Sequence, residues 1–250
     1  MLHEGPLADV PAAELRTVRA RFLAEHGWGD VDSIRGELER RDELLEQAVR
    51  DGQPIVLWFE HDLFDQVQLL QVLARLADLA SAQVELVQAD DYLGSLEAGA
   101  LERLWETRRP VAPEVFELAR AGWTAVCEGE IETFLARDTS ALPHLDAALR
   151  RLLEERQPLS RTKRQLLAAL ADGPKRPPAL FAAGQAAEEA LFLGDAWCFL
   201  HLWELAEEGL VAPVSGRLPL PPPRGDYEAF TGATLELTRA GRALVRAFAG

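Results

Sequence analysis

Sulfur, lysine and long apolar runs are all scarce in this chain of 250 residues. The two cysteines, Cys127 and Cys198, lie inside apolar helical patterns without any CxxC spacing, so we expect two core thiols in a reducing compartment. No apolar stretch approaches the roughly 20 residues of a membrane-spanning helix, and the N-terminus lacks the charged-then-apolar order of a signal peptide. These absences indicate a soluble protein of cytoplasmic type with no membrane partner.

The charge of the chain is acidic and unevenly distributed. Residues 1–150 contain 14 Arg and Lys against 29 Asp and Glu, a formal charge of −15, whereas residues 151–250 contain 12 of each kind. An acidic surface repels phosphate polymers, so only the second segment is suited to approach nucleic acid. Apolar residues make up 48% of the chain and charged residues 27%, which excludes a disordered protein.

The first part of the chain has the pattern of an α/β domain. A short, continuous apolar run at 54–59 is typical of a strand in a parallel sheet, buried on both faces. Asp62 follows as the expected N-cap of a helix. The expected elements are helices at 13–25 and 31–50, strands at 54–59 and 83–87, and helices at 63–80 and from residue 95. This order predicts a small open parallel sheet with flanking helices.

The second part of the chain is helical and then changes character. We expect an α/β domain over 1–110, a helical connector over 111–157 and a further domain over 158–250. The elements expected in the last domain are helices at 162–171, 177–186 and 195–208, strands at 210–213 and 234–237, and a helix at 239–248 capped by Thr238. Three helices followed by a two-stranded ribbon is the winged-helix plan. The whole chain is therefore expected to be mainly helical α/β with a winged-helix-like C-terminal module.

Acidic and imidazole side chains gather where the first two strands end. Glu60, His61 and Asp62 follow the first strand, and Asp91 follows the second. Ligands of open α/β sheets bind at the carboxyl ends of parallel strands, so these residues mark a candidate small-ligand site. A histidine among carboxylates can transfer protons near neutral pH or help to hold a divalent cation such as Mg²⁺, which prefers oxygen ligands. The candidate catalytic residues are His61 and Glu60, and the candidate ligand-binding residues are Glu4, Asp62, Gln66 and Asp91.

A second interpretation of these residues, a purely structural one, stays open. Asp62 and Asp65 can simply satisfy the N–H groups and dipole of the following helix, with His61 in a local hydrogen bond. The chain contains no GxGxxG, P-loop, HExxH or GxSxG motif, so it specifies neither a reaction nor even that the protein is an enzyme. The remaining histidines, His3, His26, His144 and His201, are scattered and are expected to be surface or packing residues.

The third reading is a regulator or adaptor that acts through the C-terminal module. Its helix 195–208, in the position that enters DNA in winged-helix proteins, has four acidic residues and no Arg or Lys, so it disfavours DNA. A basic cluster is formed by Arg161, Lys163, Arg164, Lys175 and Arg176, which a solvated helix end explains equally well. We therefore expect the module to contact a protein or to pack within the chain, with DNA as the less favoured partner.

Residues 57–66, Leu-Trp-Phe-Glu-His-Asp-Leu-Phe-Asp-Gln, resemble the signature of an uncharacterised bacterial family, domain of unknown function 1835. Similar stretches occur at residues 2–6, 19–23, 91–94, 138–143 and 159–162. The resemblance implies a shared fold and brings no established activity. Family members usually begin with a further strand that ends in an Asn-Gly-Asp motif, so the resemblance predicts a truncated or misplaced start here. An unpaired sheet edge would then lie beside Glu60 and Asp91.

Overall fold

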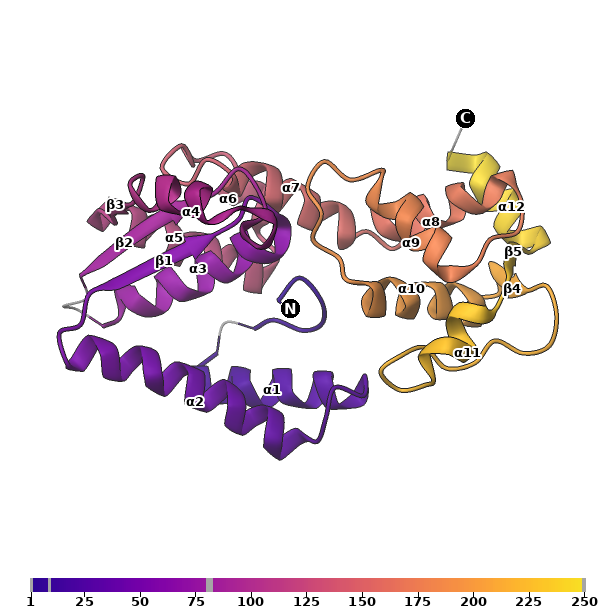
Figure 1. Cartoon of the computed structure of the whole chain (residues 1–250), viewed down its shortest axis with the longest axis horizontal. Helices are drawn as coiled ribbons and strands as arrows, with labels where there is room; N and C mark the ends of the chain where they lie inside the picture. The colour runs from indigo at the N-terminus through magenta and orange to yellow at the C-terminus, as the bar shows by residue number, and fades with distance from the viewer. Residues whose placement is uncertain (1, 9, 80–82, 249–250) are drawn as a thin grey trace. The chain divides into compact units, whose positions relative to one another are not determined.

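The computed structural model describes residues 2–8, 10–79 and 83–248 and divides into two compact units (Figure 1). Unit 1 comprises Met1–Glu25 and Gly29–Leu152, and unit 2 comprises His26–Trp28 and Leu153–Gly250. Every helix among the described residues is too short or too polar to cross a membrane. The division into domains at 110 and 157 stays a prediction.

Unit 1 combines a small sheet with a set of helices. Its strands are β1 (Ile55–Phe59), β2 (Val84–Gln88) and β3 (Arg109–Pro110). Its helices are α1 (Ala12–Glu25), α2 (Val31–Arg50), α3 (Leu63–Ala77), α4 (Ala98–Trp105), α5 (Pro113–Glu128) and α6 (Ile131–Phe134), with a 3₁₀ turn at Leu93–Ser95. Helix α7 (Leu145–Glu155) begins in unit 1 and ends in unit 2. The predicted strand–helix–strand order is therefore confirmed, although the second helix begins at Ala98 and not at Ser95.

The sheet is mixed rather than purely parallel. Strands β1 and β2 pair in parallel, with Ile55 opposite Val84, which confirms the predicted crossover. The short β3 then pairs antiparallel with β2, a strand that the sequence did not predict. Strand β1 lies at the edge of the sheet, and Phe59 is its one buried residue. The prediction of a strand buried on both faces is therefore wrong, because an edge strand receives cover from fewer neighbours.

Helix α3 forms the centre of unit 1 and lies beside the strands (Figure 1). Eight of its fifteen residues are buried, mostly leucine and valine at helical spacing. It packs closely on α5, where a Cβ atom at Gly122 would come within 2.9 Å of a Leu70 methyl group. Glycine at this position therefore permits the close approach of the two helices, which fixes α3, and with it the residues that precede it, against the sheet.

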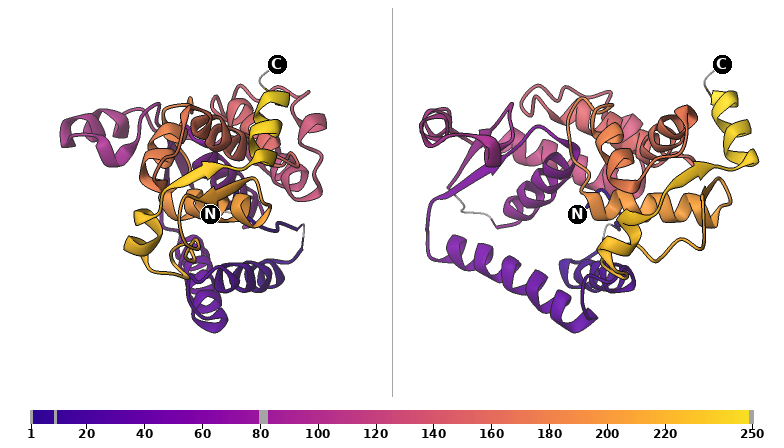
Figure 2. Two further views of the ribbon diagram at one scale, coloured as in Figure 1. Left: turned by 90° about the vertical axis from the view of Figure 1, so that its right-hand side faces the viewer. Right: turned by 45° about the vertical axis from the view of Figure 1, so that its right-hand side comes forward.

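Unit 2 contains the helices and the ribbon that the sequence predicts. Its elements are α8 (Arg161–Ala169), a 3₁₀ turn (Leu170–Asp172), α9 (Pro177–Gln185), α10 (Asp195–Glu207), β4 (Val211–Pro213), α11 (Tyr227–Gly232), β5 (Leu235–Leu237) and α12 (Arg239–Phe248). Strands β4 and β5 pair antiparallel, with Val211 opposite Leu237. Thr238 accepts the N–H of Gly241 at 3.1 Å, which confirms it as the cap of α12. Figure 2 shows α12 as the last helix before the C-terminus.

Two features of the chain differ from expectation. Helix α11 interrupts the connection between β4 and β5 and was not predicted. Cys198 is buried but Cys127 is only half-buried, so the expectation of two core thiols holds for Cys198 alone. Burial raises the pKa of the Cys198 thiol to about 12, so it stays protonated and inert at neutral pH.

Candidate functional site

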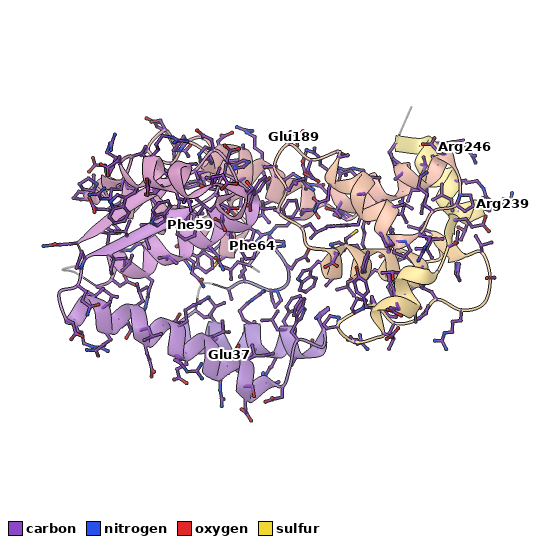
Figure 3. All side chains as sticks on the ribbon, viewed as in Figure 1. Glu37, Phe59, Phe64, Glu189, Arg239 and Arg246 are labelled. Carbon is purple, nitrogen blue, oxygen red and sulfur yellow. The ribbon has the colours of Figure 1, made fainter. Side chains whose placement is uncertain are left out.

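Hydrogen bonds to the backbone organise the segment between β1 and α3, which Phe59 and Phe64 bracket (Figure 3). Asp62 caps α3 by accepting the N–H of Asp65 at 3.1 Å, and Asp65 in turn accepts the N–H of Glu60 at 2.6 Å. The side-chain amide of Gln66 donates to the carbonyl of Glu60 at 2.7 Å. The carboxylate of Glu60 accepts the N–H of Leu93 at 2.7 Å, which joins the ends of β1 and β2.

These bonds confirm the capping role predicted for Asp62 and explain why the segment is rich in acids. Three carboxylates, those of Glu60, Asp62 and Asp65, each hold a backbone N–H group that would otherwise lack an acceptor. Within the described ranges, no three His, Cys, Asp or Glu side chains are grouped so that they could hold a metal ion. The geometry therefore gives no support to a Mg²⁺ site at this edge.

A second group of side chains lies at the same end of the strands. The ring of His61 lies 5.0 Å from the ring of Tyr92 and 6.0 Å from the ring of His144, measured between centroids. The Nε2 atom of His144 lies 3.4 Å from a carboxylate oxygen of Asp90. We call His61, Asp90, Tyr92 and His144 the strand-tip cluster. It brings together the ends of both parallel strands and the residue before α7.

Three polar side-chain atoms at the ends of β1 and β2 and in the first turn of α3 are buried without a hydrogen-bond partner among the described residues. They are Nδ1 of His61, Oε1 of Gln66 and Oε1 of Gln88. Gln66 is completely buried, and its amide nitrogen is already engaged with the Glu60 carbonyl. Buried polar atoms in folded proteins are nearly always paired. The amide oxygens can only accept a hydrogen bond, and Nδ1 of His61 accepts one when Nε2 carries the proton, so these atoms together favour a group with N–H or O–H donors.

Burial shifts the pKa of two groups at the site in opposite directions. Burial raises the pKa of Asp62 to about 6; the N–H groups of Asp65 and Phe64 oppose this, whereas the charges of Asp65 and Glu60 add to it. Burial lowers the pKa of His144. The negative charge of Asp90 opposes this shift, and the neighbouring His61 adds to it. His144 is therefore neutral at neutral pH and available for hydrogen bonding.

The predicted site residues occupy three kinds of position. Glu60, Asp62 and Gln66 form the hydrogen-bonded segment, and His61 belongs to the strand-tip cluster. Asp91 is exposed beside that cluster. Glu4 lies against α1, where its carbonyl accepts a guanidinium N–H of Arg19 at 2.5 Å. The catalytic and ligand-binding roles of these residues stay predictions.

Sequence reasoning missed His144, which was expected to be a surface or packing residue. Its side chain is only 18% exposed and contacts both His61 and Asp90. No local spacing could have indicated this role, because the contact is made between segments far apart in the chain.

The five residues of the predicted basic cluster in unit 2 are engaged in internal contacts. Arg161 pairs with Glu154 and Glu189 at 3.0 and 2.6 Å, and Lys163 pairs with Glu204 and Glu208 at 3.1 and 2.8 Å. The other three donate to backbone carbonyls: Arg164 to Leu159, Lys175 to Ala169 and Arg176 to Thr231. Seven of the thirteen residues of α10 are buried, so this helix forms the core of unit 2.

Comparison with protein-family models, with curated proteins and with solved structures finds no match to this chain. The resemblance to the family domain of unknown function 1835 therefore stays a prediction.

Proposed function

We propose that unit 1 binds a small ligand with N–H or O–H donors at the strand-tip cluster. The observation that carries the proposal is the buried Nδ1 atom of His61, which has no partner among the described residues. In the neutral imidazole this atom accepts a hydrogen bond when Nε2 carries the proton. A ligand donor would satisfy it, and the burial around it would make that bond strong and selective.

The charge of the neighbourhood sets the class of ligand. Asp90 and Asp91 are exposed after the end of β2, and Glu60 and Asp62 follow the end of β1, which pairs in parallel with β2. An anion would be repelled there, whereas a neutral or cationic molecule with amine, amide or hydroxyl groups would be accepted. The imidazoles of His61 and His144 lie close together and can both transfer protons. If the bound ligand is a substrate, His61 is the general acid or base in this proposal.

Glu60 takes a different role in this proposal from the one that the sequence indicated. Because its carboxylate holds the Leu93 N–H, it fixes Tyr92 and the turn after β2 next to His61. Glu60 is therefore a positioning residue for the site.

Ligand-detected NMR with a library of small amines, amides, alcohols and carboxylates tests the proposal. We expect the binding molecules to carry donors, to compete with one another and to lose binding in His61→Phe. His26→Phe, which changes a histidine of unit 2, is the matched control and should retain binding. Binders that are mainly carboxylates, or that bind His61→Phe as well as they bind the wild type, would exclude the site.

A second candidate function is protein contact through unit 2, and a groove of about 630 Å³ favours it. The groove lies between α10, β4 and residues 216–220 of the loop that connects β4 to α11, and its lining includes Trp203, Val211, Pro213, Leu218 and Leu220. Leu220 is 41% exposed, and Val214, which directly follows β4, is 52% exposed, so two large apolar side chains beside this groove reach solvent. We propose that α8–α10 and β4–β5 form a winged-helix-like module that contacts a protein partner through this groove.

The buried α10 and the engaged basic residues argue against DNA as the partner. A filter-binding assay with duplex DNA at low salt tests this directly. Retention of the DNA with a steep dependence on salt would contradict the proposed use of the module.

A further inference from the structure

An open groove of about 870 Å³ runs along one face of α5 in unit 1, beside α6. Most of the α5 residues that line it recur at intervals of three and four, so they share one helical face. They are Glu114, Glu117, Leu118, Ala121, Thr124, Ala125 and Glu128. A helix rises about 1.5 Å per residue, so this face is about 20 Å long and has room for a helix of about ten residues.

The middle of this groove is lined by small and apolar side chains. Ala121 and Ala125 lie one turn apart on α5, and Phe134 of α6 also lines the groove. The distance between two packed helices depends on the side chains at their contact, so alanine in the middle of the face lets a second helix come close. The groove is therefore suited to a helix as its occupant.

The groove has negative charge that its own arginines do not compensate. Its carboxylates are Glu114, Glu117, Glu128, Glu130 and Asp138, and its guanidinium groups are Arg120 and Arg137, which gives a formal charge of −3. Arg120 pairs with Glu117 and with Asp78, an aspartate outside the groove. Glu114 and Glu128, at the two ends of the face, are exposed and form no ion pair with another described residue. The groove therefore favours a cationic partner.

Helix α12 of unit 2 has the opposite charge. Its described residues include three arginines and no acidic residue. The exposed residues Arg239, Arg242, Ala243, Arg246 and Ala247 recur at intervals of three and four, and we call them the basic stripe. Arg239 and Arg246 lie at the surface of unit 2 (Figure 3). Arg242 donates to the carbonyl of Leu237, but none of the three arginines forms an ion pair with another described residue.

The groove and the basic stripe match in charge, length and side-chain size. The charge of −3 in the groove faces three guanidinium groups in the stripe, and the ten residues of α12 span about 15 Å, which is less than the length of the α5 face. Alanine residues lie between the charged positions on both surfaces. Oppositely charged surfaces that lack internal partners attract each other and fix the register of the contact.

We propose that the basic stripe of α12 binds in the α5 groove of a second copy of this chain. The arginines approach the carboxylates at the ends of the groove, and the alanines of the two helices lie against each other. The contact joins different surfaces of the two copies, so it is heterologous and associates copies head to tail. It uses no residue of the strand-tip cluster and none of the groove beside β4, so it is independent of both proposed functions.

Sedimentation equilibrium of the full chain tests the inference. We expect the average mass to rise above that of one copy as the protein concentration is raised at about 0.1 M salt. At about 1 M salt the mass should return to that of one copy, because the screening length falls from about 10 Å to about 3 Å. The formal charge of −15 disfavours association through net charge, so attraction at low salt has to come from a local contact.

Charge reversal on each side of the contact identifies the two surfaces. The groove variant Glu114→Lys/Glu128→Lys and the stripe variant Arg239→Glu/Arg246→Glu should each weaken self-association by about tenfold or more, because like charges then meet. An equimolar mixture of the two variants should associate again, because each stripe then meets a groove of opposite charge on the other variant. Recovery in the mixture also shows that both variants are folded.

The matched control is Glu37→Lys/Glu39→Lys, which reverses two exposed charges of α2 outside the groove and should associate as the wild type does. Four results would overturn the inference. They are a single copy at every concentration in low salt, no association in the mixture, an equal loss in the control and the groove variant, and unchanged association in both reversal variants. A single copy in which the stripe variant shifts the α5 amide signals would instead place the stripe in its own groove.

A different occupant would leave a different record. If an unrelated anionic surface, such as a vesicle of acidic lipid, bound α12 while the groove variant associated like the wild type, the second copy would be excluded as the partner of the stripe.

Discussion

Replacing Asp62 with asparagine should stabilise unit 1 at alkaline pH and leave it nearly unchanged at acid pH. Asp62 is 4% exposed and caps α3 through its bond to the Asp65 N–H. Asparagine is as good an N-cap as aspartate, so the substitution keeps the hydrogen bond and removes the charge. The variant therefore isolates the cost of burying the carboxylate.

The size of the effect follows from the pKa of Asp62, which burial raises to about 6. An aspartate in the unfolded chain titrates near about 4, and one pKa unit corresponds to about 1.4 kcal/mol, so the gap amounts to about 3 kcal/mol. The folded protein binds this proton more tightly than the unfolded chain does. The contribution of Asp62 to stability is therefore complete below about pH 4 and is lost as the pH rises through about 6.

Urea titrations followed by the amide signals of α3 measure unit 1 by itself, since the two units need not unfold together. The free energy of unfolding of Asp62→Asn, minus that of the wild type, should increase by about 2–3 kcal/mol between about pH 4 and about pH 8. Asp91→Asn, at an exposed aspartate after the neighbouring strand, is the matched control for the loss of one charge. A difference that does not change with pH would refute the reasoning.

Three further predictions concern the strand ends and unit 2. Glu60→Ala should lower the free energy of unfolding by about 1–3 kcal/mol, because the Leu93 N–H loses its acceptor. Glu60→Gln retains an acceptor and should lower it less; equal losses in urea titrations would contradict this. The imidazole of His144 should titrate in proton NMR with a midpoint below its ordinary pKa of 6.5, and a midpoint above 6.5 would be the contrary finding. Lowering the pH below 6.5 should therefore destabilise the wild type more than it destabilises His144→Gln. Lys163→Ala should lower the free energy of unfolding of unit 2 by about 1–2 kcal/mol in urea titrations, because two part-buried ion pairs are lost. A variant as stable as the wild type would show that these pairs contribute little.

Local patterns predicted the longer elements well. The bounds of α2 and α12 agree with the predicted ranges 31–50 and 239–248, because apolar periodicity and caps such as Thr238 act within a few residues. The two-residue β3 and the six-residue α11 escaped prediction. Elements this short have no period of their own and exist through their tertiary contacts, here the pairing of β3 with β2.

The candidate site was only partly readable from the sequence. The capping role of Asp62 follows from its position between a strand and a helix, and the meeting of the two strand ends follows from parallel pairing. The bond from Leu93 to Glu60 and the contact of His144 with His61 join distant segments, so no spacing could specify them.

The central claim is that a ligand donor completes the hydrogen bonding of His61. A crystal structure with a ligand identified by the NMR screen would test it most directly. We predict an N–H or O–H donor of the ligand within about 2.7–3.2 Å of the Nδ1 atom of His61, beside Tyr92 and His144. A ligand bound elsewhere, or a protein side chain that already donates to Nδ1, would contradict the claim.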